Sequence, residues 1–518
     1  MSKIVGIDLG TTFSVIAILN DVGKPEVLAN YETNQKVTAS AIYIDPDNKK
    51  VQVGEKALNY LKTDTDKVIT AIKQKMSDEV VYSLSKGDWI DKNTSDKDED
   101  EYSPAQLSSF ILSKLKEFNP ETKDVIITVP AMFGEAGRLA TQDAAKIAGI
   151  NVIQLINEPT AAILHYASLP DIKVIGNIMV FDLGGGTFDI SIAKVTKNGA
   201  IEMLNSVGDQ NLGGHNFDES IIEDIANKYF VSKKKKLTNQ DKKRLFPIAE
   251  KIKKTLSFKE ETNEMIDIGD GVFEYSLTRN TFYELIDFYI TKIKMLTETS
   301  LDGADPPLSK SDINQILLVG GSSRMPFVND LIKNSIGKAP TKGVDVDEAV
   351  ASGAAIFAGL NSDKSDLTSG QIKTLKNVEI EDVSNSYLGT PTLATDKERD
   401  QQRIVNDILI KRNTKLPISI TRDYYTVREN QTIVNCIITQ SEGEFSDLEF
   451  VNEIANKELK LPPDRPEGQQ IDVTFTLDKS GKLRAEFLDV ASGEKTEIDV
   501  RPESSLRPED SKLDFSID

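Results

Sequence analysis

The sequence contains few residues that form crosslinks or bind metals, with one cysteine and two histidines among 518 residues. The single cysteine, Cys436, excludes an internal disulfide and favours a reducing compartment, so we expect a cytoplasmic protein. No apolar stretch approaches the roughly 18 residues that a membrane-spanning helix needs, so we expect no membrane association. The opening residues MSKIVGIDLG enter a strand-like pattern at once, and no signal peptide is expected.

The sequence also contains fewer positively than negatively charged residues. Lys and Arg total 62 residues against 82 Asp and Glu, which gives a formal net charge of -20. Because affinity for nucleic acid comes largely from Lys and Arg, we expect no nucleic-acid partner. The basic run KKKK at 233–236 and the acidic run SDKDEDE at 95–101 are both predicted to be exposed loops.

The length predicts more than one domain, because a single hydrophobic core does not extend over so many residues. Helical and strand-like patterns alternate up to about residue 362. Residues 103–118 begin with a Ser cap and a Pro and then keep helical spacing, and residues 281–296 are predicted to form another amphipathic helix. Residues 1–362 are therefore predicted to be an α/β domain.

Beyond residue 362 the pattern changes. Residues 363–383 are polar or acidic and are predicted to be a linker, although the stretch SDKSDLTSGQIKTLKN is equally interpreted as a frayed helix. Residues 384–503 alternate with a period of two, and QIDVTFTLDKSGKLRAEFLDV predicts a hairpin, so this part is expected to be an all-β sandwich. Residues 504–518 lack sustained periodicity and are predicted to be a flexible tail.

Two Gly-rich stretches are alike: DLGTTFS at 8–14 and DLGGGTFD at 182–189. Each lies between two apolar runs, which predicts a strand, a turn and a second strand. Such a turn binds phosphate through backbone N–H groups when no side chain intervenes. Asp8 and Asp182 end the strands before the turns, where a carboxylate binds the hydration shell of Mg²⁺ or orients a water. One turn is weak evidence, but two predict a duplicated half-domain that holds one nucleotide's phosphates from both sides.

A third Gly-rich element, ILLVGGSSRMP at 316–326, predicts a buried strand, a Gly-Gly turn and a helix. This form suits a nucleoside, with Arg324 able to stack on a flat base. An ordinary strand-to-helix turn explains the same residues equally well in isolation.

The sequence closely resembles the 70-kDa heat-shock (DnaK-type) chaperone family in seven motifs: DLGTTFS, VIITVPAMFGEAGRLAT, INEPTAAILHYA, FDLGGGTFDISI, GDQNLGGHNFD, AEKIKKTLS and LVGGSSRMP. The motifs run from residue 4 to about 360, and a weaker similarity continues in RNTKLP, ENQTIV and DVTFTLDKSGKL. The resemblance implies an actin-like or sugar-kinase-like two-lobed ATPase domain, followed by a β-sandwich substrate-binding domain.

The resemblance also implies a binding site for ATP and ADP. The residues implied on the phosphate side are Gly10, Thr11, Thr12, Phe13, Gly184, Gly185, Gly186 and Thr187. Those implied on the adenosine side are Glu250, Lys253, Lys254, Ser257, Gly321, Ser322, Arg324 and Asp347.

The implied chemistry is hydrolysis of ATP. Lys73, in TAIKQKM, matches the family's catalytic lysine, which contacts the γ-phosphate and the attacking water. Glu158, in NEPTAA, acts on the water shell of the metal, and Asp182 accepts the proton of the attacking water, with Thr187 beside them. The cation positions implied for Mg²⁺ and K⁺, largely through water, are Asp8, Asp182 and Asp189. Without the resemblance, Lys73 is interpreted as a solvated helix residue and Glu158 as a residue that starts a helix.

Three features depart from the family. Phe13 stands where members usually have Tyr, which removes one hydroxyl. VEIEDV at 378–383 replaces an apolar linker, and burying carboxylates is costly, so interdomain coupling is expected to be weakened or rewired. Too few residues follow Val500 for the family's helical lid, so we expect a lidless member that releases peptide quickly.

The resemblance implies a peptide site in the β domain. By position, Leu393 and Val427 form an arch over an extended peptide and Val434 forms the central pocket. Ordinary core residues of a β domain are an equally good interpretation of these positions.

The leading hypothesis is an ATP-dependent chaperone that binds exposed apolar segments of unfolded protein, in protein folding and the stress response, with a J-domain co-chaperone and a nucleotide exchange factor. The first alternative is a lidless regulatory subunit that binds ATP and acts as a scaffold with a J-domain partner. The second is a small-molecule kinase of the same fold, which explains the Gly-rich turns but not the β domain.

Overall fold

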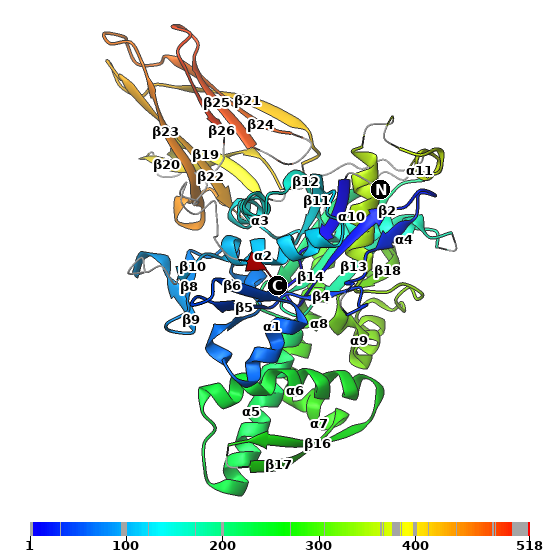
Figure 1. Cartoon of the computed structure of the whole chain (residues 1–518). Helices are drawn as coiled ribbons and strands as arrows, with labels where there is room; N and C mark the ends of the chain where they lie inside the picture. The colour runs from blue at the N-terminus through cyan, green and yellow to red at the C-terminus, as the bar shows by residue number, and fades with distance from the viewer. Residues whose placement is uncertain are drawn as a thin grey trace. The chain divides into compact units, whose positions relative to one another are not determined.

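The computed structural model describes residues 4–31, 33–94, 101–122, 124–170, 172–197, 201–269, 271–304, 306–362, 365, 367–375, 384, 386–396, 401–412, 414–441, 443–478, 481, 483–499 and 516–517. The chain divides into two compact units (Figure 1). Unit 1 comprises Met1–Gly199, Leu204–Val378 and Arg507–Asp518, and unit 2 comprises Ala200–Met203 and Glu379–Leu506. The acidic linker sequence at 378–383 and most of the predicted tail lie outside the described residues.

The first lobe of unit 1 is built on a six-stranded sheet. Its strands are β1 (Ile4–Asp8), β2 (Phe13–Leu19), β3 (Pro25–Val27), β4 (Thr38–Ala39), β11 (Asp124–Val129) and β12 (Asn151–Asn157). The order is β12-β11-β1-β2-β3, with β4 paired to β2, and β1 is antiparallel to β2 but parallel to β11.

Two smaller sheets and several helices complete this lobe. The smaller sheets contain β5 (Ile42–Asp45), β6 (Lys50–Val53), β7 (Val68–Ile69), β8 (Val80–Ser83), β9 (Asp88–Asp91), β10 (Glu101–Tyr102) and β27 (Ser516–Ile517). The helices are α1 (Glu55–Asn59), α2 (Pro104–Glu117), α3 (Glu135–Ile147) and α4 (Glu158–Ser168), with 3-10 turns η1 (Tyr60–Lys62), η2 (Thr65–Lys67), η3 (Ile72–Lys75) and η4 (Lys92–Thr94).

The second lobe repeats the strand order of the first. Its sheet contains β13 (Gly176–Leu183), β14 (Phe188–Val195), β15 (Ile201–Asp209) and β18 (Ile313–Val319), in the order β15-β14-β13-β18. Here β13 is antiparallel to β14 and parallel to β18, just as β1 is to β2 and β11. The predicted duplication of strand, Gly-rich turn and strand is therefore confirmed.

The remaining elements of the second lobe include a hairpin and a group of helices, most of them drawn in green in Figure 1. They are α5 (Gly214–Lys233), α6 (Asn239–Phe258), β16 (Glu261–Ile268), β17 (Gly271–Thr278), α7 (Arg279–Leu285), α8 (Asp287–Asp302), η5 (Lys310–Asp312), η6 (Gly321–Arg324) and α9 (Pro326–Ile336). The helix α10 (Ala349–Leu360) packs on both β1 and α4, and α11 (Ser369–Leu375) follows it.

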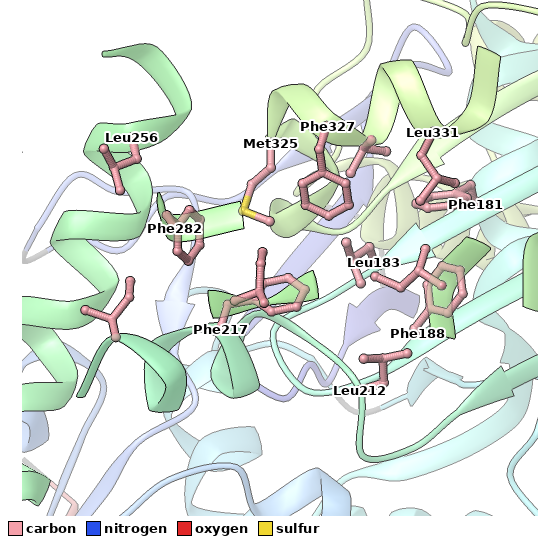
Figure 2. Close-up of a cluster of buried hydrophobic side chains, with 14 of the residues drawn as sticks. Phe181, Leu183, Phe188, Leu212, Phe217, Leu256, Phe282, Met325, Phe327 and Leu331 are labelled. Atoms are coloured by element: carbon pink, nitrogen blue, oxygen red, sulfur yellow. The ribbon is translucent and has the colours of Figure 1, made fainter. Parts of the chain in front are cut away.

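The apolar core of the second lobe holds its Gly-rich turn in place. Leu183 and Phe188, which lie on either side of that turn, are fully buried. They belong to one cluster with Phe217 of α5 and Phe327 of α9 (Figure 2). Packing of this kind fixes the ends of the turn, so the turn itself does not depend on polar contacts alone.

Most of the predicted elements of unit 1 are confirmed. The helix expected at 103–118 is α2, whose N-cap Ser103 accepts from Gln106 in a capping box with Pro at the first turn. The helix expected at 281–296 is wrong in one respect, because the chain breaks at Ile286 into α7 and α8. Ile286 is fully buried, and its burial accounts for the apolar spacing that continues across the break.

Two segments outside residues 1–362 pack on the first lobe. The helix α11 lies in the predicted linker, within the stretch for which a frayed helix is the alternative. Gln371 Nε2 donates to Leu19 O (2.9 Å), and Leu375 is buried beside Leu19. Within the predicted flexible tail, β27 pairs in parallel with β6, and Ile517 packs against the core of the first lobe.

Unit 2 is an all-β sandwich, as predicted. One sheet contains β19 (Tyr387–Asp396), β20 (Gln401–Ile410), β22 (Ile433–Ser441) and β23 (Asn452–Lys460), and the other contains β21 (Ile418–Tyr425), β24 (Gln470–Leu477), β25 (Leu483–Asp489) and β26 (Lys495–Asp499). Side chains from both sheets form one buried cluster, which includes Cys436 and Phe475. Between residues 384 and 499, the described elements are these strands and one 3-10 turn, η8 (Leu448–Phe450).

None of the helices in the part of the chain that the structure describes is long and apolar enough to cross a membrane.

Candidate functional site

The two Gly-rich turns lie directly against each other. A Cβ atom on Gly185 would lie 1.7 Å from Thr12 Oγ1, and one on Gly186 would lie 2.4 Å from Thr11 Cγ2. Residues with side chains are therefore excluded at both positions unless the turns separate. The structure thus brings together the predicted phosphate-side residues of the two lobes.

The carbonyl groups of both turns are bound from outside. In the first turn, Ser40 Oγ donates to Gly10 O (2.7 Å) and Ser40 N donates to Thr12 O (2.8 Å). In the second turn, Gly214 N donates to Gly184 O (3.0 Å) and His215 N donates to Gly185 O (2.6 Å). Because C=O and N–H point in opposite directions across a planar trans peptide, these bonds also fix the direction of the following N–H groups.

Carboxylates gather beside the turns because the relevant strands end there. Asp8 ends β1, Glu158 directly follows β12, and Asp182 lies opposite Asp189 across the β13–β14 pair. Carboxyl ends of parallel strands meet at one edge of a sheet, and like charges placed opposite each other are unfavourable. Thr128 Oγ1, from β11, donates to Asp8 Oδ1 (3.0 Å).

Two of the predicted catalytic residues, Lys73 and Glu158, contact each other. Lys73 Nζ donates to Glu158 Oε1, and both side chains are almost completely buried, at 8% and 6% exposure. Lys73 lies in η3, which follows Ala71 in a left-handed backbone conformation (φ 54°). That conformation costs a residue with a Cβ about 1–2 kcal/mol, so the packing around η3 outweighs it to present Lys73.

Negative charge exceeds positive charge in this cluster. Burial, reinforced by neighbouring carboxylates, raises the pKa of Asp8 to about 6 and that of Asp189 to about 7, and raises the pKa of Asp182 well above its usual range. Burial alone lowers the pKa of Lys73, but Glu158 and Asp8 outweigh it, so the Lys73 pKa is raised and the ammonium stays charged. The cluster therefore favours an additional cation.

The donor set suits a hydrated cation better than a directly bound one. Within the described residues, no group of three or more His, Cys, Asp and Glu side chains is arranged as a direct ligand set. Glu158 nevertheless raises the pKa of Asp8, Asp182 and Asp189, and both Asp8 and Asp189 raise that of Asp182, so negative charge gathers around these residues. Mg²⁺ readily keeps several waters when it binds carboxylates, so these residues fit a Mg²⁺ held largely through water.

The predicted adenosine-side residues form a second group around Gly214. A Cβ there would lie 2.4 Å from Ser322 Oγ and 2.9 Å from Lys253 Nζ. Lys253 Nζ donates to Gly214 O (2.9 Å) and to Asp218 Oδ2 (2.7 Å), and both charged side chains are buried. Asp218 is a residue that sequence reasoning missed, because its role depends on a contact with another helix.

The other adenosine-side residues surround this group. Lys254 pairs with Glu250 (2.8 Å) and lies 5.3 Å from the centre of the Phe13 ring, so a ring without the hydroxyl still makes a contact between the lobes. Ser257 Oγ donates to Lys253 O (3.2 Å). Gly321 begins η6, as the predicted Gly-Gly turn requires.

Arg324 is held by two aspartates. Its Nη2 donates to Asp345 Oδ1 (2.6 Å) and to Asp347 Oδ2 (2.7 Å), while 43% of the side chain stays exposed. Asp347, a predicted adenosine-side residue, therefore orients Arg324, and Asp345 was missed by the sequence analysis.

The three predicted peptide-site residues differ in how far their side chains are exposed. Leu393 is 40% exposed and pairs across the strand with Ile404, which is 61% exposed. Val427 is 51% exposed and follows β21, whereas Val434 on β22 packs partly into the sandwich core. Exposed aliphatic side chains on a β unit are candidates for contact with an apolar partner.

The chain matches the model of the Hsp70 protein family over residues 4–513. It therefore belongs to the 70-kDa heat-shock protein family. Members of this family are nucleotide-binding ATPases and chaperones that bind unfolded polypeptides, which gives the chain a chaperone role in general terms.

The contact between the turns predicts that Gly185→Ala weakens nucleotide binding. The added methyl must displace Thr12, whereas a Cβ on Gly184 would meet Thr187 O only at 3.4 Å. We expect Gly185→Ala to lower the affinity for ATP at least tenfold, about 1.4 kcal/mol, and Gly184→Ala to lower it much less. Calorimetric titration measures both, and equal losses in the two variants would contradict the packing argument.

The raised pKa of Asp189 predicts that Asp189→Asn stabilises the nucleotide-free protein. Since the native state binds a proton that the unfolded state has released, the carboxylate lowers the free energy of unfolding increasingly from pH 4 to pH 7. We expect a gain of about 1–3 kcal/mol at pH 8 that shrinks toward pH 4. Urea unfolding in EDTA, followed by the fluorescence of the single Trp89, measures it.

The matched control is Glu284→Gln, at an exposed position on α7, which should change stability by no more than about 0.5 kcal/mol. An Asp189→Asn protein that is no more stable than wild type at pH 8 would show that the carboxylate is not destabilised by its surroundings.

Proposed function

We propose that this member of the 70-kDa heat-shock protein family hydrolyses ATP between the two Gly-rich turns and couples hydrolysis to binding of extended polypeptide. The observation that carries the proposal is the buried Lys73–Glu158 pair beside Asp8, Asp182 and Asp189. Transfer of a phosphoryl group to water needs positioning and neutralisation of negative charge more than covalent chemistry. A buried ammonium and backbone N–H donors supply both.

Each residue has a role in this proposal. Lys73 neutralises charge on the γ-phosphate and orients the attacking water, and Asp182, whose raised pKa makes it a better base, accepts the proton of that water. Thr187, next to the second turn, donates to the phosphates. Asp8, Asp182 and Asp189 would hold Mg²⁺ largely through water, with Glu158 acting on the same water shell, and the ion would supply neutralisation of phosphate charge. K⁺ is a second candidate cation.

In this proposal the adenosine binds beside Lys253 and Ser322. Arg324, held by Asp347, lies on its outer side, and the other residues around it are Lys254, Glu250, Ser257 and Gly321. Support comes from the closeness of Lys253 and Ser322 at Gly214 and from the bound guanidinium of Arg324. A guanidinium held along one edge is preorganised to stack on a base.

Unit 2 is proposed to bind exposed apolar segments of unfolded protein. Leu393 and Val427 are the arch residues and Val434 the pocket residue of this proposal, which the exposure of the first two and the partial burial of Val434 support. An extended segment gains affinity from main-chain hydrogen bonds and specificity from side-chain pockets. A J-domain co-chaperone and a nucleotide exchange factor are the proposed partners, and the cytoplasm is the proposed location.

Removal of either member of the buried pair should abolish hydrolysis. We expect Lys73→Ala and Glu158→Ala to lower the single-turnover rate of ATP hydrolysis at least a hundredfold, about 2.7 kcal/mol. The control is Lys75→Ala, at a neighbouring lysine that pairs with Asp78 on the surface (3.1 Å). Unchanged hydrolysis in both site variants would refute the mechanism.

Peptide release separates the chaperone cycle from a scaffold. We expect the intact chain to release a fluorescent apolar peptide at least ten times faster with ATP than with ADP, because hydrolysis is proposed to set affinity in unit 2. Equal release rates with the two nucleotides would favour a regulatory subunit that binds ATP without using it.

A further inference from the structure

Gln74 joins the two lobes at the candidate site. It lies in η3, directly after Lys73, on the first lobe. Its Nε2 donates to Gly186 O (2.7 Å) and to Gln210 O (3.2 Å), both on the second lobe. One side-chain amide has two N–H donors, and two carbonyl acceptors fix which end of the amide carries the nitrogen.

The bond to Gly186 completes a series along the second turn. The carbonyls of Gly184 and Gly185 accept from backbone N–H groups at the start of α5, and the carbonyl of Gly186 accepts from Gln74. The first two bonds stay within the second lobe, whereas the third comes from the opposite lobe. Because the peptide after Gly186 is planar, Gln74 also fixes the direction of the Thr187 N–H.

The Gln74 side chain also packs tightly against this turn. A Cβ on Gly186 would lie 2.9 Å from both Cδ and Nε2 of Gln74. The turn therefore fits against the Gln74 side chain without spare room. Since a single peptide bond separates Gln74 from Lys73, any movement of the second turn away from the first lobe also disturbs the segment that carries Lys73.

We propose that Gln74 is a positioning residue that ties the second Gly-rich turn to the segment carrying Lys73 and thereby slows the release of bound nucleotide. The inference rests on the proposed nucleotide site, whose regulation it describes. Opening of the two lobes requires both Gln74 hydrogen bonds to break, and the Gly186 carbonyl then loses its bond from the first lobe.

Three variants test this role. Gln74→Met keeps the length of the side chain and removes both donors, and Gln74→Glu places a carboxylate against two carbonyl oxygens. Lys75→Ala is the control on the same turn, at a half-buried lysine that pairs with Asp78. We expect Gln74→Met to release ADP about tenfold faster, as loss of hydrogen bonds worth about 1.4 kcal/mol predicts. Gln74→Glu should release it faster still, and Lys75→Ala should stay within about twofold of wild type.

Displacement of a fluorescent ADP analogue in Mg²⁺ measures the release rates. A Gln74→Met protein that releases ADP at the wild-type rate would overturn the proposal, because packing alone would then suffice. A positioning role further predicts that saturating ATP restores much of the hydrolysis rate in Gln74→Met, since the chemical groups remain, whereas it does not in Lys73→Ala.

Amide hydrogen exchange of the nucleotide-free protein distinguishes this idea from the proposed function itself. Gln74→Met should exchange faster than wild type at residues 184–187 and 210–214, and Lys75→Ala should not. If wild type binds no nucleotide, the proposed function fails while this exchange difference still supports the Gln74 contact. Unchanged exchange in a folded Gln74→Met protein would refute the proposed role of Gln74.

Discussion

The excess of buried negative charge between the two Gly-rich turns is the constraint on which the rest of the site depends. There Glu158 acts on Asp8, Asp182 and Asp189, Asp8 and Asp189 act on Asp182, and the Lys73 ammonium opposes their effects on all three aspartates. Such a cluster lowers the free energy of unfolding of the nucleotide-free protein, and binding of a cation and its ligand offsets this loss. The raised pKa values of Asp8, Asp182 and Asp189 reflect that cost.

The repeated sheet explains how one chain assembles such a cluster. In each lobe a central strand is antiparallel to the next strand and parallel to a later one, so a turn and the ends of parallel strands meet at one edge. Each lobe has its own apolar core, and the second core contains the residues on both sides of its turn. The lobes can therefore move as bodies while the turns keep their shape.

Local features of the site were predictable from the sequence, and contacts across the fold were not. The Gly-rich turns and the aspartates beside them are local, because strand, turn and carboxylate follow one another in the chain. Asp218 and Gln74 were missed, since nothing beside Gln74 indicates carbonyl partners 112 and 136 residues away. The break at Ile286 was not predicted, because a buried residue at that position continues the helical spacing of apolar residues.

Titration of the intact chain with ATP, in Mg²⁺ and in EDTA, tests the central claim most directly. If the buried carboxylates require a cation to accept a nucleotide, ATP binds in Mg²⁺ and at least tenfold more weakly in EDTA, a difference of about 1.4 kcal/mol or more. Binding of equal strength in both conditions, or no binding in either, would contradict the account.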